Sequence, residues 1–260
     1  MTALTITHPS GRAGLDWLIG GWRLFAGGVI PWMGMAAVGL LATTFVGMIP
    51  YAGSIAVEGL SPFLVAGFMV ASRAAGAKAP FSFYMFVDGF RDAPKQLAAI
   101  GAVYLVASLI AELAMRALGG EGFKLLFELA RTRPETLDPA QAELILHQAL
   151  PALAAGMLIL TPALLATWFA PALVLFHGFS PFKAMYWSLW ACAVNWRPML
   201  IYGLWLTLAA VVAILIPFGL GLLVFVPVAM TSTYIAYGAL FVSAEPVVEA
   251  EQPAPAEGDA

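Results

Sequence analysis

Residues 31–50 read PWMGMAAVGLLATTFVGMIP, and residues 198–217 read PMLIYGLWLTLAAVVAILIP. Both stretches begin and end with proline, contain no charged side chain, and are soon followed by glycine. A helix needs about 20 apolar residues to cross the hydrocarbon core of a bilayer. Proline and glycine stop a helix and allow a tight turn outside the bilayer. The two stretches therefore predict membrane-spanning helices, each followed by a hairpin turn.

The composition of the whole chain is typical of a membrane protein. The 260 residues are 62% hydrophobic and only 10% charged, whereas a soluble domain carries about 25% charged residues. No stretch alternates apolar and polar residues as the strands of a membrane β-barrel do, and backbone groups in lipid must be satisfied within their own segment. We therefore expect an all-α polytopic membrane bundle with six spans, at residues 31–49, 53–73, 96–118, 151–176, 198–216 and 220–242.

The same order of segments occurs three times, in units 15–75, 81–178 and 180–242. Each unit has an aromatic amphipathic stretch, a first span, and a second span that contains proline. Because each unit starts and ends on one side of the membrane, the units predict parallel repeats rather than the inverted repeats common in secondary transporters. This weakens an alternating-access mechanism without excluding it.

An interfacial amphipathic helix is predicted before each first span. In the first such stretch, Leu18, Trp22 and Phe25 recur at helical spacing, and the counterparts lie at 81–91 and 182–197. Aromatic rings favour the headgroup level, and amphipathic helices lie flat there. An anchoring belt is the simpler interpretation, and docking of a peptide or lipid is the alternative.

Three segments are expected outside the bundle: a flexible N-terminus at 1–14, an insert at 119–150 and a disordered tail at 243–260. The remaining segment, 15–242, forms the membrane domain, and no cleavable signal peptide is recognised. The insert reads as two short amphipathic helices that cap the bundle or bind a partner, the second with Asp138 as its N-cap. The tail holds five acidic and no basic residues, and it lacks the apolar surface that would offset the entropy of ordering.

The distribution of Lys and Arg predicts the orientation. Eight of them fall on the side that carries both termini: Arg12, Arg23, Arg73, Lys78, Arg91, Lys95, Lys183 and Arg197. Cytoplasmic loops are enriched in Lys and Arg. We therefore expect a multi-pass protein of the bacterial inner membrane with both termini in the cytoplasm.

Glu58 is the most suggestive single residue of the sequence. A carboxylate at the midplane of a bilayer costs about 2.5–3.5 kcal/mol on insertion scales, so an intramembrane glutamate is a functional candidate by default. Glu58 follows the first turn by only a few residues. The alternative is therefore that its side chain reaches interfacial water.

Four prolines lie inside the second spans: Pro62, Pro162, Pro171 and Pro227. Each removes a hydrogen bond to the carbonyl four residues earlier and bends its helix. Three bent helices around one axis predict a central cavity or a lateral groove. The simpler interpretation is that membrane helices tolerate proline and pack better when bent.

The other intramembrane polar candidates are Glu112, Arg116 and His177. Glu112 and Arg116 are spaced i,i+4, where opposite charges pair along one helix face, so a structural ion pair is the simpler interpretation. A histidine at a helix end, as His177 is, is more often a cap or dipole partner than a ligand. No metal-ligand spacing, phosphate loop or nucleophile elbow occurs, and the single cysteine, Cys192, forms no intrachain disulfide. We expect no catalytic residue, metal or cofactor, and no nucleic-acid partner.

Several of these motifs resemble those of a known family. The run 168–178 (WFAPALVLFHG), the segment 188–196, and the residues from Ser61 to Gly67 and from Arg73 to Arg91 resemble a family of uncharacterised bacterial inner-membrane proteins of this size. The similarity covers nearly all of 14–242. The family has no assigned activity, so the resemblance implies no residue role. More distantly, the hairpins look like membrane domains attached to glycerophosphodiesterases, whose catalytic domain this chain lacks.

These observations favour a non-enzymatic scaffold, lipid-interacting protein or accessory subunit. Its expected partners are the bilayer and either a membrane protein or a second copy of the chain. The alternative is a transporter or channel for a small or lipophilic substrate that uses Glu58 and the bent helices. A weaker third hypothesis is an intramembrane enzyme acting on lipid through His177 or Glu112.

Overall fold

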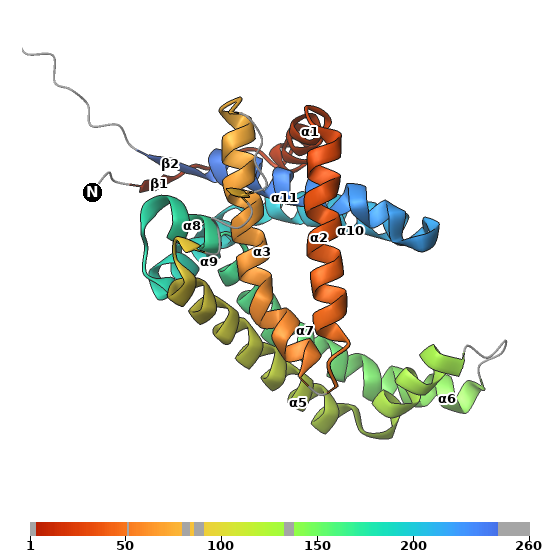
Figure 1. Cartoon of the computed structure of the whole chain (residues 1–260). Helices are drawn as coiled ribbons and strands as arrows, with labels where there is room; N and C mark the ends of the chain where they lie inside the picture. The colour runs from red at the N-terminus through yellow and green to blue at the C-terminus, as the bar shows by residue number, and fades with distance from the viewer. Residues whose placement is uncertain (1–3, 51, 80–83, 86–90, 133–137, 244–260) are drawn as a thin grey trace, which may run out of the picture.

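A computed structural model describes residues 4–50, 52–79, 84–85, 91–132 and 138–243. Helices make up nearly all of this part of the chain (Figure 1). They are α1 (Ala13–Ala26), α2 (Val29–Gly47), α3 (Gly53–Gly76), α5 (Pro94–Thr132), α6 (Pro139–Leu144), α7 (Leu150–Trp168), α8 (Ala170–His177), α9 (Pro181–Val194), α10 (Trp196–Leu215) and α11 (Leu220–Leu240). Shorter elements are a π-helical turn (Ile145–Ala149), a 3-10 turn (Pro217–Gly219) and the strands β1 (Leu4–Ile6) and β2 (Phe241–Ser243).

The described residues contain six helical stretches that are long and apolar enough to cross a membrane. They are Val29–Gly47, Gly53–Gly76, Pro94–Leu126, Pro139–His177, Trp196–Leu215 and Pro217–Leu240. The prediction of an all-helical membrane protein with six spans is therefore confirmed. The relation of the three units as parallel repeats stays a prediction.

The insert between the third and fourth spans is helical wherever it is described. Gly120, with φ 48° and ψ −136°, breaks α5 at the point where the span passes into the insert. Asp138 caps α6 as predicted, because its side chain accepts a hydrogen bond from the Ala140 N–H at 3.2 Å and Pro139 takes the first helical position. The Gln148 side chain accepts a hydrogen bond from the Gly122 N–H at 3.0 Å, which ties the two halves of the insert together.

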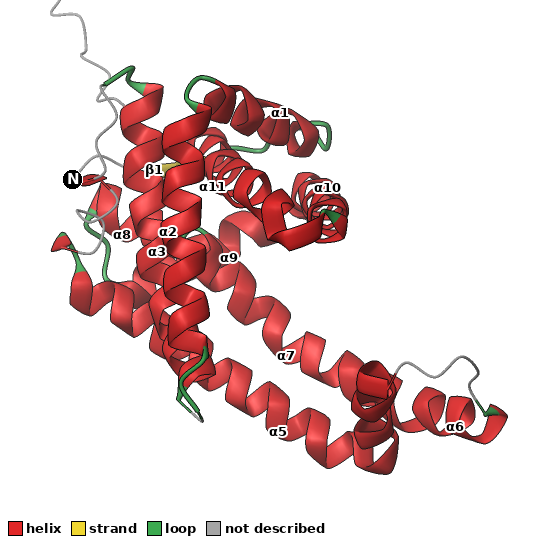
Figure 2. Ribbon diagram, turned by 45° about the vertical axis from the view of Figure 1, so that its right-hand side comes forward, coloured by secondary structure: helices red, strands yellow, loops and turns green. Residues whose placement is uncertain are grey.

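The spans pair into three arms that diverge from one end of the molecule. The pairs α2–α3, α5–α7 and α10–α11 each pack along their length, and we call them the arms. Figures 1 and 2 both show the turn end of the α10–α11 arm well apart from the turn ends of the other two arms. At the other end the arms meet α1, α8, α9, β1 and β2, a region that we call the hub.

Two of the arms close through a glycine at the start of the returning helix. In the α2–α3 arm a Cβ on Gly53 would collide with the Gly47 backbone, and in the α10–α11 arm a Cβ on Gly221 would collide with the Ala213 backbone. Without a side chain at these positions the returning helix can lie directly on the preceding one. The glycines that marked the turns in the sequence therefore set the close packing of the arms.

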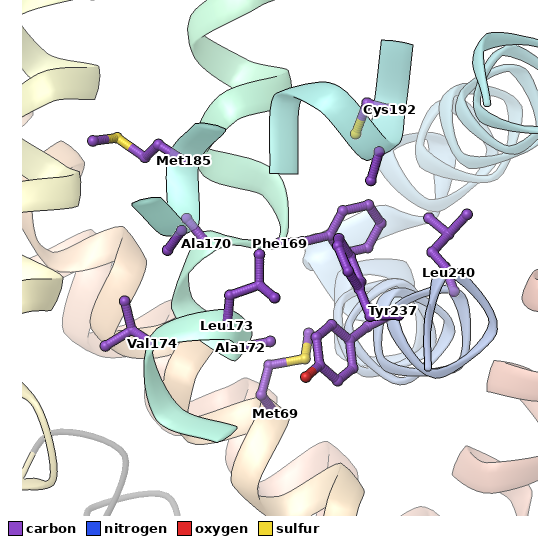
Figure 3. Packing of buried hydrophobic residues seen from close by; sticks show 14 of the residues in the cluster. Met69, Phe169, Ala170, Ala172, Leu173, Val174, Met185, Cys192, Tyr237 and Leu240 are labelled. Carbon is purple, nitrogen blue, oxygen red and sulfur yellow. The ribbon is translucent and has the colours of Figure 1, made fainter. Parts of the chain in front are cut away.

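The buried core lies in the hub. Its largest cluster joins residues from nearly every helix, and Figure 3 shows Met69, Phe169 and Tyr237 converging there from different segments. The Phe169 ring meets the Phe241 ring edge-to-face at 5.7 Å. A second cluster packs Trp32 and Phe68 in a stacked pair at 6.4 Å. The halves of the arms near the hub are therefore the parts that pack against other helices.

The strands correct the expectation of a flexible N-terminus over 1–14. Leu4–Ile6 pairs antiparallel with Phe241–Ser243, with Thr5 opposite Val242. The Thr7 N–H donates to the Leu240 carbonyl at 3.0 Å, and the Asn195 side chain donates to the Thr7 carbonyl at 3.0 Å. The start of the chain is therefore joined to the end of the last span. Of the predicted tail at 243–260, all but Ser243 lies outside the described residues.

Helix α1 forms as predicted, and one of its faces packs on the last arm, while its location at the membrane interface stays a prediction. The buried residues of α1 are Gly14, Trp17, Gly21 and Phe25, whereas Trp22 is exposed. A Cβ on Gly14 or Gly21 would collide with the backbone of α10 or α11, respectively. The helix therefore packs its glycine face directly on the last arm. Most of the second amphipathic stretch, 81–91, lies outside the described residues, and the third coincides largely with α9, which packs in the hub.

Candidate functional site

A cavity of about 360 Å³ lies between α3, α5, α7, α8 and α11. It brings together three of the predicted candidates, because Glu58, Pro62 and Pro171 all line it. Pro162 and Pro227 do not: Pro162 is exposed on α7, and Pro227 is buried in the hub. Two of the four prolines therefore lie in the wall of this cavity, and the role of the prolines in forming a cavity stays a prediction.

Glycines let the walls of this cavity approach one another. A Cβ on Gly101 of α5 would lie 3.1 Å from the Gly59 carbonyl and 3.4 Å from Pro62 Cγ. Small residues at such crossings allow membrane helices to pack backbone against backbone. The crossing of α3 and α5 thus places Glu58 and Pro62 at the edge of the cavity.

The carbonyl that Pro62 leaves without its helical donor is the Glu58 carbonyl, four residues earlier. The neighbouring Ser61 hydroxyl donates to this carbonyl at 2.9 Å. Pro62 therefore sits within an uninterrupted α3 without an unpaired carbonyl at Glu58. The backbone around Glu58 is satisfied, in contrast to its side chain.

Two polar side-chain atoms at the cavity are buried without a partner. Among the described residues, the buried side-chain N and O atoms that lack a hydrogen bond are Glu58 Oε2, Trp168 Nε1 and Ser72 Oγ. Both Glu58 and Trp168 line the cavity. An unpaired buried polar group costs about 1–3 kcal/mol, and more if it is charged. Both residues line the cavity, but these two atoms are themselves buried beneath its surface.

The break between α7 and α8 fixes the opposite wall. The Ser188 hydroxyl of α9 accepts a hydrogen bond from the Phe169 N–H at 3.0 Å and donates to the Leu165 carbonyl at 2.6 Å. One hydroxyl thus bridges the two groups that would otherwise bond directly within a continuous helix. Pro171, two residues beyond the break, starts the new helix, and Trp168 is held beside the cavity as a result. The sequence pointed to the proline but not to Ser188.

The remaining predicted residues lie elsewhere. Glu112 and Arg116 form the predicted ion pair, with Arg116 Nε 3.0 Å from Glu112 Oε1. They line a different cavity, of about 970 Å³, where α5 passes into the insert. His177 ends α8 in the hub, with its ring 5.7 Å from that of Phe179 and 6.2 Å from that of Tyr237. The structure therefore joins neither Glu112 nor His177 to the Glu58 cavity.

An apolar groove of about 740 Å³ runs along the α10–α11 arm beside α1. Its wall includes Trp22 from α1, Trp205 and Val212 from α10, and Phe225 from α11. Every residue that lines it is uncharged and apolar. Trp22, which the sequence predicts at the membrane interface, lines this groove.

The hub end of the molecule is basic. Arg12, Arg23, Lys183 and Arg197 are all exposed there. The described residues form two ion pairs, Glu112–Arg116 and Glu121–Lys124, and neither involves these cations. Instead Lys183 Nζ lies 4.1 Å from the centre of the Phe179 ring, and the Arg197 guanidinium lies 5.2 Å from the centre of the Trp196 ring. Their charges remain available to anions at this surface.

Within the described residues no group of three or more His, Cys, Asp or Glu side chains is placed to hold a metal ion. Cys192 is buried in α9, and this burial raises the pKa of its thiol to about 12. A raised pKa keeps the thiol protonated and unreactive. The hub therefore uses Cys192 as a small apolar residue.

The chain is similar to a probable inner membrane protein of Burkholderia thailandensis. The two are 30% identical over 213 residues, which cover 79% of this chain and 77% of the relative. No family model matches the sequence, and no solved structure matches it.

Proposed function

We propose, from the premise that this chain belongs to the family of the Burkholderia thailandensis probable inner membrane protein, that it is a non-enzymatic, lipid-interacting protein of the inner membrane. The single observation that carries the proposal is the apolar groove beside α1, α10 and α11. A phospholipid acyl chain is the occupant that we assign to it.

The shape and chemistry of the groove support an acyl chain. From Trp205 to Ala213 the groove follows α10 over eight residue steps, which is about 12 Å at 1.5 Å per residue. Apart from the indole rings of Trp22 and Trp205, its wall is made of aliphatic and phenyl side chains and glycine, so it offers an apolar chain mostly apolar contact. Burial of apolar chains in such a surface is favourable and needs no directional contact.

The charge near the groove supports an anionic headgroup. Arg23 follows Trp22 on α1, and two further exposed cations are Arg12, which precedes α1, and Arg197, at the start of α10. Basic residues beside a membrane attract anionic lipids by about 1 kcal/mol each. A phospholipid would place its acyl chain in the apolar groove and its phosphate near these cations, so that it contacts both the apolar and the basic part of the surface.

The experiment is native mass spectrometry after gentle extraction, with two variants of neighbouring valines. Val212→Trp fills the groove, whereas Val211→Trp places the same ring outside it, since Val212 lines the groove and Val211 does not. Both valines are about half exposed, at 55% and 50%. We expect the wild type and Val211→Trp to retain phospholipid and Val212→Trp to lose it. Equal retention in all three proteins would contradict the proposal.

The orientation of the chain belongs to the same proposal. The exposed cations of the hub favour a cytoplasmic location for the hub and both termini, which places the turns of the arms in the periplasm. Ser54→Cys marks a turn and Ala79→Cys marks the hub side, and both positions are exposed. In intact cells a membrane-impermeant maleimide should label Ser54→Cys alone, and the opposite pattern would invert the orientation.

A second candidate function is transport of a small or lipophilic substrate, which the position of Glu58 in the wall of its cavity favours. Glu58→Gln keeps the size of the side chain and removes its charge, so a transporter should lose flux in liposomes while remaining folded. Flux that is unchanged in this variant, or absent from the wild type, would leave only the lipid-interacting function.

A further inference from the structure

We infer that the cavity at the break in α5 is a binding site for a phosphate ester that carries a primary ammonium group. Arg116 and Lys124 bind the phosphate, and Glu128 binds the ammonium group. This cavity, of about 970 Å³, lies where α5 passes into the insert, whereas the apolar groove follows α10 and α11. The inference therefore does not depend on the proposed lipid-interacting function.

The cavity forms from a charged stripe that bends at a glycine. Five of its lining residues recur at a spacing of four, and they are Glu112, Arg116, Gly120, Lys124 and Glu128. Residues at this spacing are neighbours on a helix surface, and on an unbroken helix such a stripe is convex. Gly120, with φ 48° and ψ −136°, breaks the helix at the centre of the stripe, and Figure 1 shows α5 changing direction before α6. The break therefore turns the two halves of the stripe into walls of one cavity.

The charged groups of these walls are accessible to a ligand. The side chains of Arg116 and Glu112 are 70% and 50% exposed, and that of Lys124 is 73% exposed. Glu128 is exposed as well. Phe123, which is buried, adds an apolar side chain to the wall. A ligand in the cavity can therefore reach charges of both signs.

Both cations keep donors that their ion pairs leave unused. The Arg116 guanidinium contacts Glu112 through Nε, at 3.0 Å, and through one Nη atom. Lys124 Nζ lies 2.7 Å from Glu121 Oε1. A guanidinium has five N–H donors and an ammonium group has three, so each cation retains at least two. Because both cations stand four residues from Gly120, one on each side, we assign the phosphate to the centre of the cavity.

Glu128 decides that the ligand also carries a cation. Neither ion pair among the described residues includes Glu128, whereas Arg116 and Lys124 are each paired with a carboxylate. A phosphate alone would add a second negative charge beside Glu128, and an amine alone would leave the free donors of the two cations to water. A zwitterion places an opposite charge against each. A primary ammonium group donates hydrogen bonds to a carboxylate, which a quaternary ammonium group cannot do.

The position and the packing of the cavity suit a headgroup. Arg116 lies near the end of the span predicted at 96–118, and the headgroups of a bilayer lie beyond the ends of its apolar core. Small-molecule sites measure about 300–1,000 Å³, a range that includes this cavity. The Gln148 side chain accepts from the Gly122 N–H at 3.0 Å and so fixes the chain just after the break. A wall held in this way loses little conformational freedom when a ligand binds.

Two sources carry this chemistry: the headgroup of phosphatidylethanolamine, and soluble glycerophosphoethanolamine. The full chain is reconstituted in nanodiscs of phosphatidylcholine alone or of phosphatidylcholine mixed with phosphatidylethanolamine, and the lipid that it retains is measured by native mass spectrometry. In the phosphatidylcholine nanodiscs, glycerophosphoethanolamine is then titrated and the thermal unfolding midpoint is followed. Glycerophosphocholine is the counterpart with a quaternary ammonium group.

We expect the wild type either to retain phosphatidylethanolamine in preference to phosphatidylcholine or to be stabilised by glycerophosphoethanolamine and not by glycerophosphocholine. Glu128→Gln should weaken that effect about tenfold, because a charge-assisted hydrogen bond is lost. Lys124→Gln should weaken binding by a smaller factor, because Arg116 still holds the phosphate. Glu143→Gln and Lys95→Gln change exposed residues of the same two types outside the cavity. They serve as matched controls, with binding unchanged.

The two measurements separate the sources. Preference for phosphatidylethanolamine assigns the site to the lipid headgroup, and stabilisation by glycerophosphoethanolamine without that preference assigns it to the free zwitterion. Absence of both effects in the wild type, or effects of equal size in Glu128→Gln, overturns the inference. If Glu128→Gln fails to fold, weaker binding by Lys124→Gln than by Lys95→Gln supports the inference, and equal binding overturns it.

The groove variant distinguishes this inference from the proposed function. Val212 lines the apolar groove and not this cavity. Val212→Trp should therefore lose the lipid of the groove and keep the effect of the ammonium group, so that failure of one proposal can be told from failure of the other.

Discussion

The hub and the turn ends of the arms are made of equally apolar helices, yet their surfaces face different surroundings. In the hub, Leu173 and Leu240 are fully buried against other helices. At the turn ends, Phe45 is 68% exposed and Leu215 is 76% exposed. Lipid is the medium that covers such apolar surfaces in a membrane protein. The comparison teaches that hydropathy finds a span but does not say whether protein or lipid covers it.

The residues that do distinguish the two regions are small or hydroxyl-bearing. The buried polar side chains of the described residues are Ser72, Ser188, Asn195, Thr231, Ser232 and Thr233, and all of them lie in the hub. Tyr202 bonds to Ser232 at 2.8 Å and to Thr233 at 3.0 Å across the last arm. Helix interfaces in membranes are enriched in such residues because lipid gives apolar helices no reason to associate.

The sharpest test of this comparison truncates one leucine in each region. Leu173→Ala opens a cavity in the hub and should lower the free energy of unfolding by about 2–5 kcal/mol. Leu215→Ala at the turn end removes a side chain that faces lipid, and it should change that free energy by less than about 0.5 kcal/mol. Denaturant titration in detergent micelles measures both. Similar losses in the two variants would show that the turn ends are covered by protein.

The next largest effect concerns the glycine face of α1. In Gly21→Ala the added methyl group collides with the Ser232 backbone, and such overpacking costs about 1–3 kcal/mol. In Gly238→Ala the methyl group meets open space, so this control should be neutral or slightly stabilising. The thermal unfolding midpoint reports both variants. A neutral Gly21→Ala would contradict the close packing of α1 against α11.

A smaller effect is expected at the α7–α8 break. Ser188→Ala removes the hydroxyl that bridges Phe169 and Leu165 and should cost about 1–2 kcal/mol, because a buried N–H loses its partner. Thr207→Ala removes a hydroxyl that bonds within its own exposed helix turn, and it should cost little. The same denaturant titration compares them, and equal costs would mean that the bridge does not hold the break.

The smallest expected effect concerns the chemical reactivity of the Cys192 thiol. Because burial raises the pKa of the Cys192 thiol to about 12, only about 1 thiol in 10,000 is ionised at pH 8. Maleimide labelling of the folded protein should therefore be slow at pH 7–9 and become fast once the protein unfolds. The contribution of the neutral thiol to the free energy of unfolding is fully present below the ordinary pKa of cysteine, and it falls as the pH rises toward 12. Cys192→Ala with Ala193→Cys exposes the thiol next door, and mass spectrometry should detect rapid labelling there.

The spans and the polar candidates could be predicted from the sequence because the bilayer imposes length and excludes charge. Which face of α1 is buried could not be predicted from the sequence. Trp17 and Trp22 are equally apolar, and only contact with α10 and α11 decides that Trp17 is buried at 3% while Trp22 is exposed at 52%. Gly14 and Gly21, one above the other on that face, were the available signal. Such small residues indicate close packing of helices, which a hydropathy profile does not reveal.

The candidate site was predictable only in part for a similar reason. Glu58, Pro62 and Pro171 attract attention as a charge and two prolines within apolar runs. Trp168 and Ser188 look like ordinary residues of such runs, and their roles depend on segments that approach one another only after folding. The cavity forms only where five helices come together in the folded protein, and the local sequence does not show which helices meet.

The pairing of β1 with β2 sets the order in which this protein can be completed. The ribosome releases residues 4–6 before the six spans and residues 241–243 after them, and these strands pair with each other. The first strand therefore stays unpaired until all six spans have been synthesised, and this strand pairing follows membrane insertion. A chain truncated just after Leu240 would carry every span and still lack its final closure.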